Sequence, residues 1–137
     1  MGGLAALKLL LDTHVWVWSL VEPSKLSRRT IRILRDPKNQ LWLSSISLWE
    51  VFALIDRGRI RVEGTAEAWV ARALQATPVN EAPLTWDIVK VSRQSGLAHQ
   101  DPADRFLAGT AKVMRLTLVT GDDRLLKSPD IQTLAAR

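Results

Sequence analysis

The sequence predicts an α/β protein in which helices cover both faces of a mainly parallel sheet. Two observations predict this class. Short apolar runs such as residues 6–12 and 116–120 are typical of strands buried on both faces. These runs alternate with longer amphipathic segments, the order expected for parallel strands joined by helical crossovers. The length of 137 residues, with 47% hydrophobic and 24% charged residues, suits one globular domain over residues 1–137.

Five segments of the sequence are predicted to form strands. Residues 6–12, 40–45 and 116–120 are rich in Leu. Residues 77–84 contain two prolines, so a short strand there belongs at an edge of the sheet, because proline has no N–H to donate to a neighbour. Residues 131–136 are predicted to form a last strand, also at an edge.

Helices are predicted between the strands, and capping residues mark their ends. The expected N-caps are Ser24 or Ser27, Thr65, and Asp101 with Pro102 at the first helical position. The helices are predicted over residues 13–23, 24–36, 45–58, 65–76, 85–96, 101–115 and 122–128, with Pro23, Pro37, Gly58 and Gly96 as stop residues.

Four carboxylates fall at equivalent places in this pattern. Asp12 closes the first strand, and Asp122 follows the strand at 116–120. Glu50 shares a helix face with apolar residues, and Asp104 lies in the first turn of its helix. Sites in parallel sheets gather at the carboxyl ends of the strands, so we expect these four acids to converge there.

Each acid also has a structural interpretation. Asp12 could cap the next helix, and Asp122 could be a turn residue or the N-cap of the helix that follows it. Asp104 could interact favourably with the helix dipole, and Glu50 could pair with an arginine. Asp101 and Asp123 are assigned mainly to capping and solvent. Four converging carboxylates, however, would repel one another unless a cation lay among them. Mg²⁺ or Mn²⁺ fits, because these hard ions bind carboxylates and also recruit phosphate oxygens.

The bulk charge narrows the class of partner. The net charge of +5 favours a polyanionic partner such as nucleic acid, or an acidic protein, with plain solubility as the alternative. The absence of cysteine excludes disulfides and thiolate metal sites, and a cytoplasmic protein fits best. No stretch reaches the roughly 20 apolar residues that a membrane span needs.

Four blocks of the sequence resemble the PIN-domain family, in particular its VapC-type ribonuclease toxins. The blocks are LLLDTHVW, SSISLWEV, DPADRFLAGTA and LVTGDD, and they run in family order over nearly the whole chain. The resemblance implies a three-layer α/β/α sandwich and an endoribonuclease that depends on Mg²⁺ or Mn²⁺. It places the catalytic and metal-binding acids at Asp12, Glu50, Asp104 and Asp122, with Thr120 and Asp123 as accessories. Ala108 and Ala111 match the small-residue side of the third helix block.

The resemblance also implies a cognate antitoxin and a homodimer. With a metal-activated water as nucleophile, RNA cleavage should leave a 5′-phosphate and a 3′-hydroxyl. Two other functions compete. A phospho-acceptor signalling domain needs a lysine after a late strand, which LTLVTGDD lacks. A non-catalytic nucleic-acid-binding or scaffold domain of the same fold would not need four intact acids.

The remaining aromatic and basic residues leave alternatives open. A structural or surface role is favoured for His14 and His99 over contact with substrate. Trp42, Trp49 and Trp69 are predicted to be core residues. Trp16 and Trp18 lie two positions apart, so one narrow helix face does not bury both, and one of them is a candidate protein contact. A solvated helix face is favoured over RNA binding for Arg28, Arg29, Arg32 and Arg35.

Overall fold

The computed structural model describes residues 6–94 and 101–137 and contains a five-stranded sheet. The strand order is β3-β2-β1-β4-β5, and every neighbouring pair is parallel. The predicted edge strands are therefore confirmed at both edges. The strands are β1 (Lys8–Leu11), β2 (Gln40–Ser44), β3 (Asn80–Ala82), β4 (Thr117–Thr120) and β5 (Gln132–Ala135).

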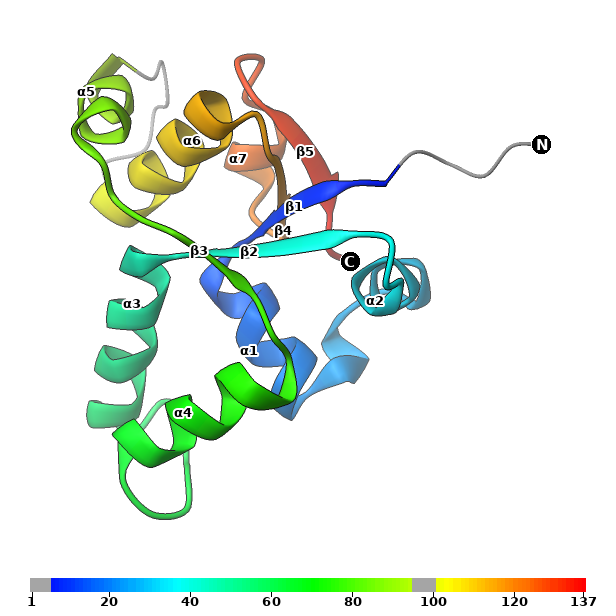
Figure 1. Ribbon diagram of the computed structural model, residues 1–137, viewed down its shortest axis with the longest axis vertical. Coiled ribbons are helices and arrows are strands. Elements are labelled where there is room, and N and C mark those ends of the chain that lie inside the picture. The colour runs from blue at the N-terminus through cyan, green and yellow to red at the C-terminus, as the bar shows by residue number, and fades with distance from the viewer. Residues whose placement is uncertain (1–5, 95–100) are drawn as a thin grey trace.

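Helices cover the two faces of the sheet and make the predicted three layers (Figure 1). On one side lie α1 (Thr13–Val21), α2 (Arg28–Arg35), α3 (Ser45–Asp56) and α4 (Ala66–Ala76), and on the other lie α5 (Trp86–Gln94), α6 (Pro102–Met114) and α7 (Asp123–Leu126). In the part of the chain that the structure describes, no helix is long and apolar enough to cross a bilayer.

Several of these helices begin at the predicted capping residues. Ser27 accepts a hydrogen bond from the backbone N–H of Thr30, and Thr65 caps α4 in the same way. The predicted helix over 24–36 begins later than expected, because Pro23–Lys25 form a separate 3₁₀ turn, η1, and Ser27 rather than Ser24 is the cap. The predicted end of α5 at Gly96 lies outside the described residues.

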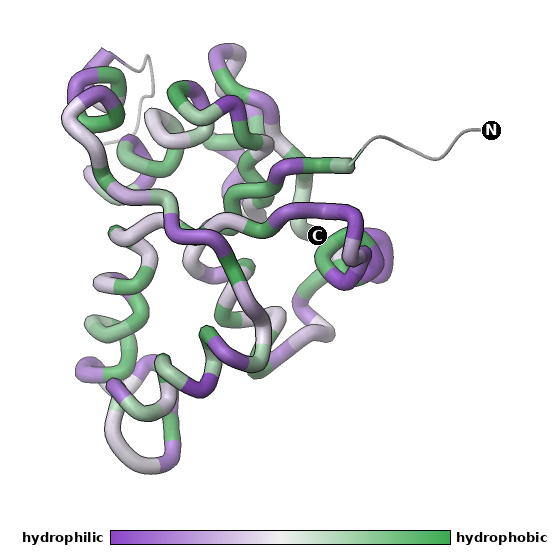
Figure 2. The backbone as a smooth tube through the Cα atoms, in the orientation of Figure 1, coloured by the Kyte–Doolittle hydropathy of each residue, from purple (hydrophilic) through white to green (hydrophobic). Residues whose placement is uncertain are grey.

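Successive side chains of the central strands point to opposite faces of the sheet and pack into two separate hydrophobic cores. Leu9 and Leu11 of β1 pack toward α1, α3 and α4, whereas Leu10 between them packs toward α6 and α7. Val119 and Leu118 of β4 divide in the same way. Hydrophobic colour accordingly follows the middle strands in Figure 2. This double burial explains why β1 and β4 are continuous apolar runs in the sequence.

Close packing of α5 on α6 depends on a glycine. A Cβ at Gly109 would lie 3.0 Å from the backbone oxygen of Ile88 and 3.1 Å from the backbone nitrogen of Ser92. Neighbouring Ala108 and Ala111 are also buried. Small residues thus let α6 approach both the sheet and α5, and this contact holds the N-terminal turn of α6 at the carboxyl edge of the sheet.

The tryptophans divide differently from the prediction. Trp42 and Trp69 pack partly buried against the cores, and Trp16 is fully buried with its ring 6.4 Å from that of Trp69. The core prediction for Trp49 is wrong, because its side chain is 64% exposed. Two positions on a helix turn a side chain by about 200°, and Trp49 lies two positions from the buried residues on either side, Ser47 and Val51.

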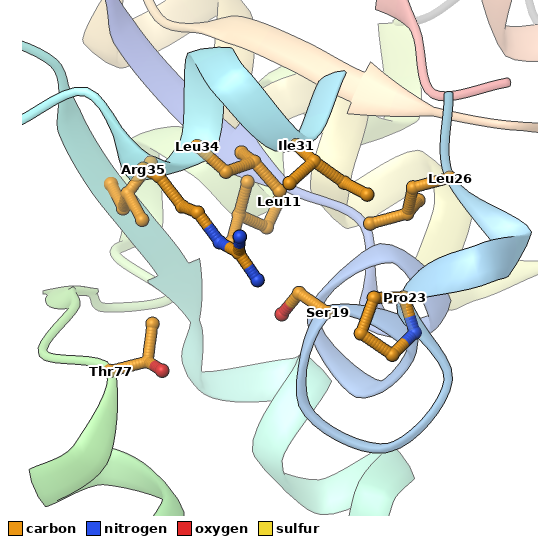
Figure 3. Close-up of a pocket in the computed structure, with 9 residues that line it drawn as sticks. Leu11, Ser19, Pro23, Leu26, Ile31, Leu34, Arg35 and Thr77 are labelled. Carbon is orange, nitrogen blue, oxygen red and sulfur yellow. The ribbon is translucent and has the colours of Figure 1, made fainter. Parts of the chain in front are cut away.

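A small apolar pocket of about 90 Å³ lies beneath α2. Figure 3 shows Ile31 and Leu34 of α2 facing Leu11 and Leu26, with the side chain of Arg35 reaching over the gap. No carboxylate lines this pocket among the residues described. This pocket is therefore a packing gap between α2 and the sheet, away from the predicted site acids.

Candidate active site at the carboxyl edge of the sheet

Thr120 links the first and last predicted site acids. The β1–β4 register pairs Leu11 with Val119, so Asp12 lies beside Thr120 where both strands end. The Thr120 hydroxyl donates to Asp12 Oδ2 at 2.7 Å and accepts from the backbone N–H of Asp122 at 3.0 Å. Thr120 is fully buried. The predicted Thr-x-Asp pattern therefore joins Asp12 and Asp122 through one buried hydroxyl.

Asp12 and Asp122 differ in how they relate to the helices that follow them. Asp12 is at the N-cap position of α1, but its side chain makes no capping hydrogen bond, so the capping alternative for Asp12 is wrong. Asp122 does cap α7, and its Oδ1 accepts from the N–H of Arg124 at 2.8 Å. The Arg124 side chain lies 3.5 Å from the same oxygen. Asp123 is exposed in the first turn of α7.

Glu50 projects from α3 and accepts a hydrogen bond from the hydroxyl of Thr13, a residue that the sequence pattern does not single out. Thr13 Oγ1 lies 2.6 Å from Glu50 Oε1 and 2.8 Å from Ser47 Oγ. Both hydroxyl residues are buried. Burial is the largest effect on Glu50 and raises its pKa; the Thr13 hydrogen bond lowers it, and the charges of Asp12 and Asp101 raise it. The partner of Glu50 is thus a threonine, not the arginine considered from the sequence.

Asp104 shows most directly that the acids share one field. Burial, followed by the charges of nearby carboxylates, raises the pKa of Asp104 to about 7. The contributing carboxylates are Asp101, Asp12, Asp122 and Glu50. Asp101 caps α6 as predicted, accepting from the N–H of Ala103 at 3.0 Å, yet its charge also acts on Asp104. Carboxylates from four separate segments therefore interact at one edge of the sheet.

The chemistry of this donor set fits a hard divalent cation. Every donor is a carboxylate oxygen, the preferred ligand of Mg²⁺ and Mn²⁺, and a cation would offset the repulsion that raises the pKa of Asp104. Within residues 6–94 and 101–137, however, no three acidic or histidine side chains form a ready-made metal site. The acids therefore suit a hard divalent cation by their negative charge and their oxygen ligands.

The two histidines have different places. His14 is exposed in the first turn of α1, close enough to Glu50 that its charge lowers the pKa of that carboxylate, and its ring lies 5.8 Å from Trp18. His99 lies outside the described residues. Trp18 is partly buried on the same helix as fully buried Trp16.

A comparison with protein families decides the fold family. The model of the PIN domain matches residues 9–130, which include all four predicted site acids. The chain belongs to the PIN-domain family. Its blocks at Asp12, Glu50, Asp104 and Asp122 are thus parts of a PIN domain, and the sheet with helices on both faces is the PIN fold.

Known proteins similar to this PIN domain agree with that assignment. It is 28% identical over 120 residues to Ribonuclease VapC22 of Mycobacterium tuberculosis (strain ATCC 25618 / H37Rv), covering 85% of this chain and 88% of that protein. VapBC2 from Rickettsia felis, solved bound to a DNA fragment from its promoter, has a TM-score of 0.69 at 15% identity, covering 93% of this chain and 98% of that chain.

A second structural neighbour is VapBC-5 of Mycobacterium tuberculosis, a member of the VapBC family of toxin–antitoxin systems. Its TM-score is 0.61 at 17% identity, covering 93% of this chain and 97% of that chain. At these identities the structural likeness establishes the fold of the PIN domain.

Proposed function

We propose that this PIN domain is an endoribonuclease that depends on Mg²⁺ or Mn²⁺ and acts as the toxin of a toxin–antitoxin pair. The observation that carries the proposal is the convergence of the carboxylates at the carboxyl edge. The buried Thr120 hydroxyl contacts Asp12 Oδ2 at 2.7 Å and the backbone nitrogen of Asp122 at 3.0 Å, and the charges of Asp12, Asp122 and Glu50 all act on Asp104. The similarity to Ribonuclease VapC22 supports RNA as the substrate. The net charge of +5 on a chain with an acidic site also suits a polyanionic substrate held by surfaces outside that site.

Asp12, Glu50, Asp104 and Asp122 would hold the metal. The bound ion would lower the pKa of a water ligand and neutralise charge on the phosphate. Thr120 fixes Asp12 through its 2.7 Å hydrogen bond, and Thr13 fixes Glu50 in the same way. Such outer hydrogen bonds restrict the rotamers of metal-binding carboxylates. Asp123 and Asp101 stay outside this set as accessory charges, Asp101 through its effect on Asp104.

Cleavage of RNA with and without metal tests the proposal. The purified protein is expected to cut a defined single-stranded RNA with Mg²⁺ or Mn²⁺ and to lose that activity in excess chelator. Full activity in chelator would contradict the metal mechanism. RNA binding with no cleavage under any divalent ion would favour the competing non-catalytic function.

The partners follow from the same proposal. We infer a cognate antitoxin, supported by the VapBC neighbour described as a toxin–antitoxin system. A homodimer and a cytoplasmic location are inferred from the resemblance to VapC-type toxins alone. An acidic pocket attracts basic side chains, so an antitoxin tail should insert an Arg or Lys among Asp12, Asp104 and Asp122. A structure of the complex tests this contact, and a tail that stays remote from the three acids would refute it.

A further inference from the structure

A basic groove begins beside the acidic site and runs along α1. It has a volume of about 400 Å³ and lies between α1, η1 and residues 54–61, at the end of α3. Its ionic lining is Lys25, Arg59 and Arg61 against one acid, Glu22, whose carboxylate is 3.7 Å from Lys25 Nζ. Among the described residues, the guanidinium groups of Arg59 and Arg61 have no salt-bridge partner, so positive charge dominates the groove.

An aromatic pair forms the end of the groove nearest the acids. The rings of His14 and Trp18 are 5.8 Å apart, and Arg137 lies over the Trp18 ring with 4.7 Å between guanidinium carbon and ring centroid. Lys25 Nζ lies 5.5 Å from the same centroid. Cations interleaved with aromatic rings are the lining that single-stranded nucleic-acid grooves use, because cations hold phosphates and rings stack on bases.

Two contacts connect the groove to the acidic site. His14 lines the groove and also lies within electrostatic range of Glu50. Trp18 and Arg137 flank Gly121, the residue before Asp122, since a Cβ there would lie 3.5 Å from Arg137 Nε and 3.7 Å from the Trp18 ring. A single-stranded nucleic acid with one phosphate at the acids would therefore have its neighbouring nucleotides beside the cations and aromatic rings of the groove.

We propose that this groove binds the single-stranded RNA substrate beside the cleaved phosphate, with Arg59 and Arg61 on backbone phosphates and His14 with Trp18 beside a base. The proposal rests on the proposed ribonuclease function and adds where its substrate lies. It gives His14 and Trp18 a role in substrate binding and separates a basic binding surface from the acidic chemical site. RNA is favoured over an acidic protein because the charges are combined with aromatic rings.

The test compares two double variants of the full chain that remove the same charge. Arg59→Gln/Arg61→Gln changes the groove, and Arg28→Gln/Arg32→Gln changes exposed residues of α2, outside it. Binding of a fluorescein-labelled oligouridine is measured by anisotropy in chelator, across a salt series. The groove variant should bind about tenfold more weakly, and the slope of log K against log salt should fall by about 1.4, or about 0.7 for each lost phosphate contact. The α2 variant should bind like the parent.

Cleavage kinetics separate this proposal from the function on which it rests. With Mn²⁺, the groove variant should raise KM about tenfold and leave kcat within about twofold, because both arginines act on binding. If both variants bound RNA equally, the proposed RNA-binding role of the groove would be wrong. Cleavage by the parent protein would still support the proposed ribonuclease function. A groove variant that loses only antitoxin binding would also overturn it. A parent that binds RNA through the groove but does not cleave would contradict the proposed function alone.

Discussion

Polar residues are exposed where the strands of the sheet begin, at its amino edge, and are buried where the strands end, at its carboxyl edge. At the amino edge, β1, β2, β3 and β5 begin with the exposed residues Lys8, Gln40, Asn80 and Gln132. At the carboxyl edge, Ser44 and Thr120 end their strands fully buried, and Thr13 and Ser47 are buried just beyond. Burying hydroxyls has a cost unless each is hydrogen-bonded, and two of them, Thr13 and Thr120, bond to site carboxylates.

This difference indicates which edge is built for chemistry. Burial, followed by the charges of the neighbouring acids at the carboxyl edge, destabilises the ionised form of Asp104, which a purely structural edge would not require. The amino edge carries its polar groups into solvent. Substitutions at the two edges should therefore differ in their effect on activity by orders of magnitude.

The largest effect is expected from a matched pair of Asp→Asn variants at the two edges. Asp12→Asn should lower the cleavage rate about a thousandfold or more, because the proposed metal site would lose a carboxylate ligand, an effect of several kcal/mol. Asp130→Asn, an exposed residue two positions before β5, should cleave like the parent. Initial rates on a defined RNA measure both, and circular dichroism checks the fold. Comparable activity in the two variants would remove the functional distinction between the edges.

A smaller effect is expected from the buried hydroxyl between Asp12 and Asp122. Thr120→Val removes the donor to Asp12 and the acceptor for the N–H of Asp122, so activity and metal affinity should fall about 10- to 100-fold. Thr120→Ser keeps the hydroxyl and should retain most of the activity. Titration with Mn²⁺ and initial rates measure the effect. If Val and Ser behaved alike, the methyl group and not the hydrogen bond would be what matters.

Burial of Asp104, together with like-charge repulsion from its neighbours, predicts a stability effect on the order of 1 kcal/mol. The pKa of Asp104 in the folded state, about 7, exceeds its usual value of 3.8, so the folded protein holds more protons between these values. Stability should therefore fall as pH rises from about 4 through about 7. In chelator, Asp104→Asn should match the parent near pH 4 and be more stable at pH 8. Urea denaturation at both pH values measures this; an equal difference at both would show that the charge is not the cause.

The smallest effect is expected at the amino edge. Lys8→Gln removes a charge from the exposed start of β1 and should change the free energy of unfolding by less than about 0.5 kcal/mol. Cleavage should stay within about twofold of the parent, since Lys8 lies at the opposite end of the strand from Asp12. Denaturation and rate measurements on one preparation check both values. A loss of activity like that of Thr120→Val would mean that the amino edge also contributes to RNA cleavage.

The sequence predicts this fold well because the pattern and the local chemistry agree. The continuous apolar runs of β1 and β4 predict burial on two faces, and Thr65 and Asp101 mark helix starts that the structure confirms. The exposure of Trp49 was missed because its hydrophobicity says nothing about which side of α3 faces the core. The face of α3 that turns toward the core is determined by how the helix packs against the sheet.

The site is less predictable than the fold because it depends on distances across the chain. Asp12, Glu50 and the accessory Thr120 can be proposed from the sequence, and the structure shows that Thr120 bonds to Asp12. The hydroxyl that bonds to Glu50 belongs to Thr13, on another segment, and the only sequence signal for it is a polar β-branched residue between a strand and an apolar helix. Asp122 follows a strand and precedes a helix, a position at which an Asp commonly caps the helix, and the structure confirms that it caps α7.

The central claim is that the carboxyl edge is a hydrolytic centre for RNA, and the ends of the cleaved RNA test it most directly. A defined RNA is cut with Mg²⁺ or Mn²⁺, and both fragments are weighed by mass spectrometry. A water nucleophile activated by the metal expels the 3′-oxygen, so the fragments should carry a 5′-phosphate and a 3′-hydroxyl. A 2′,3′-cyclic phosphate on the upstream fragment would contradict this chemistry, because the 2′-hydroxyl of the RNA would then be the nucleophile, and attention would move from the carboxylates to His14 and His99.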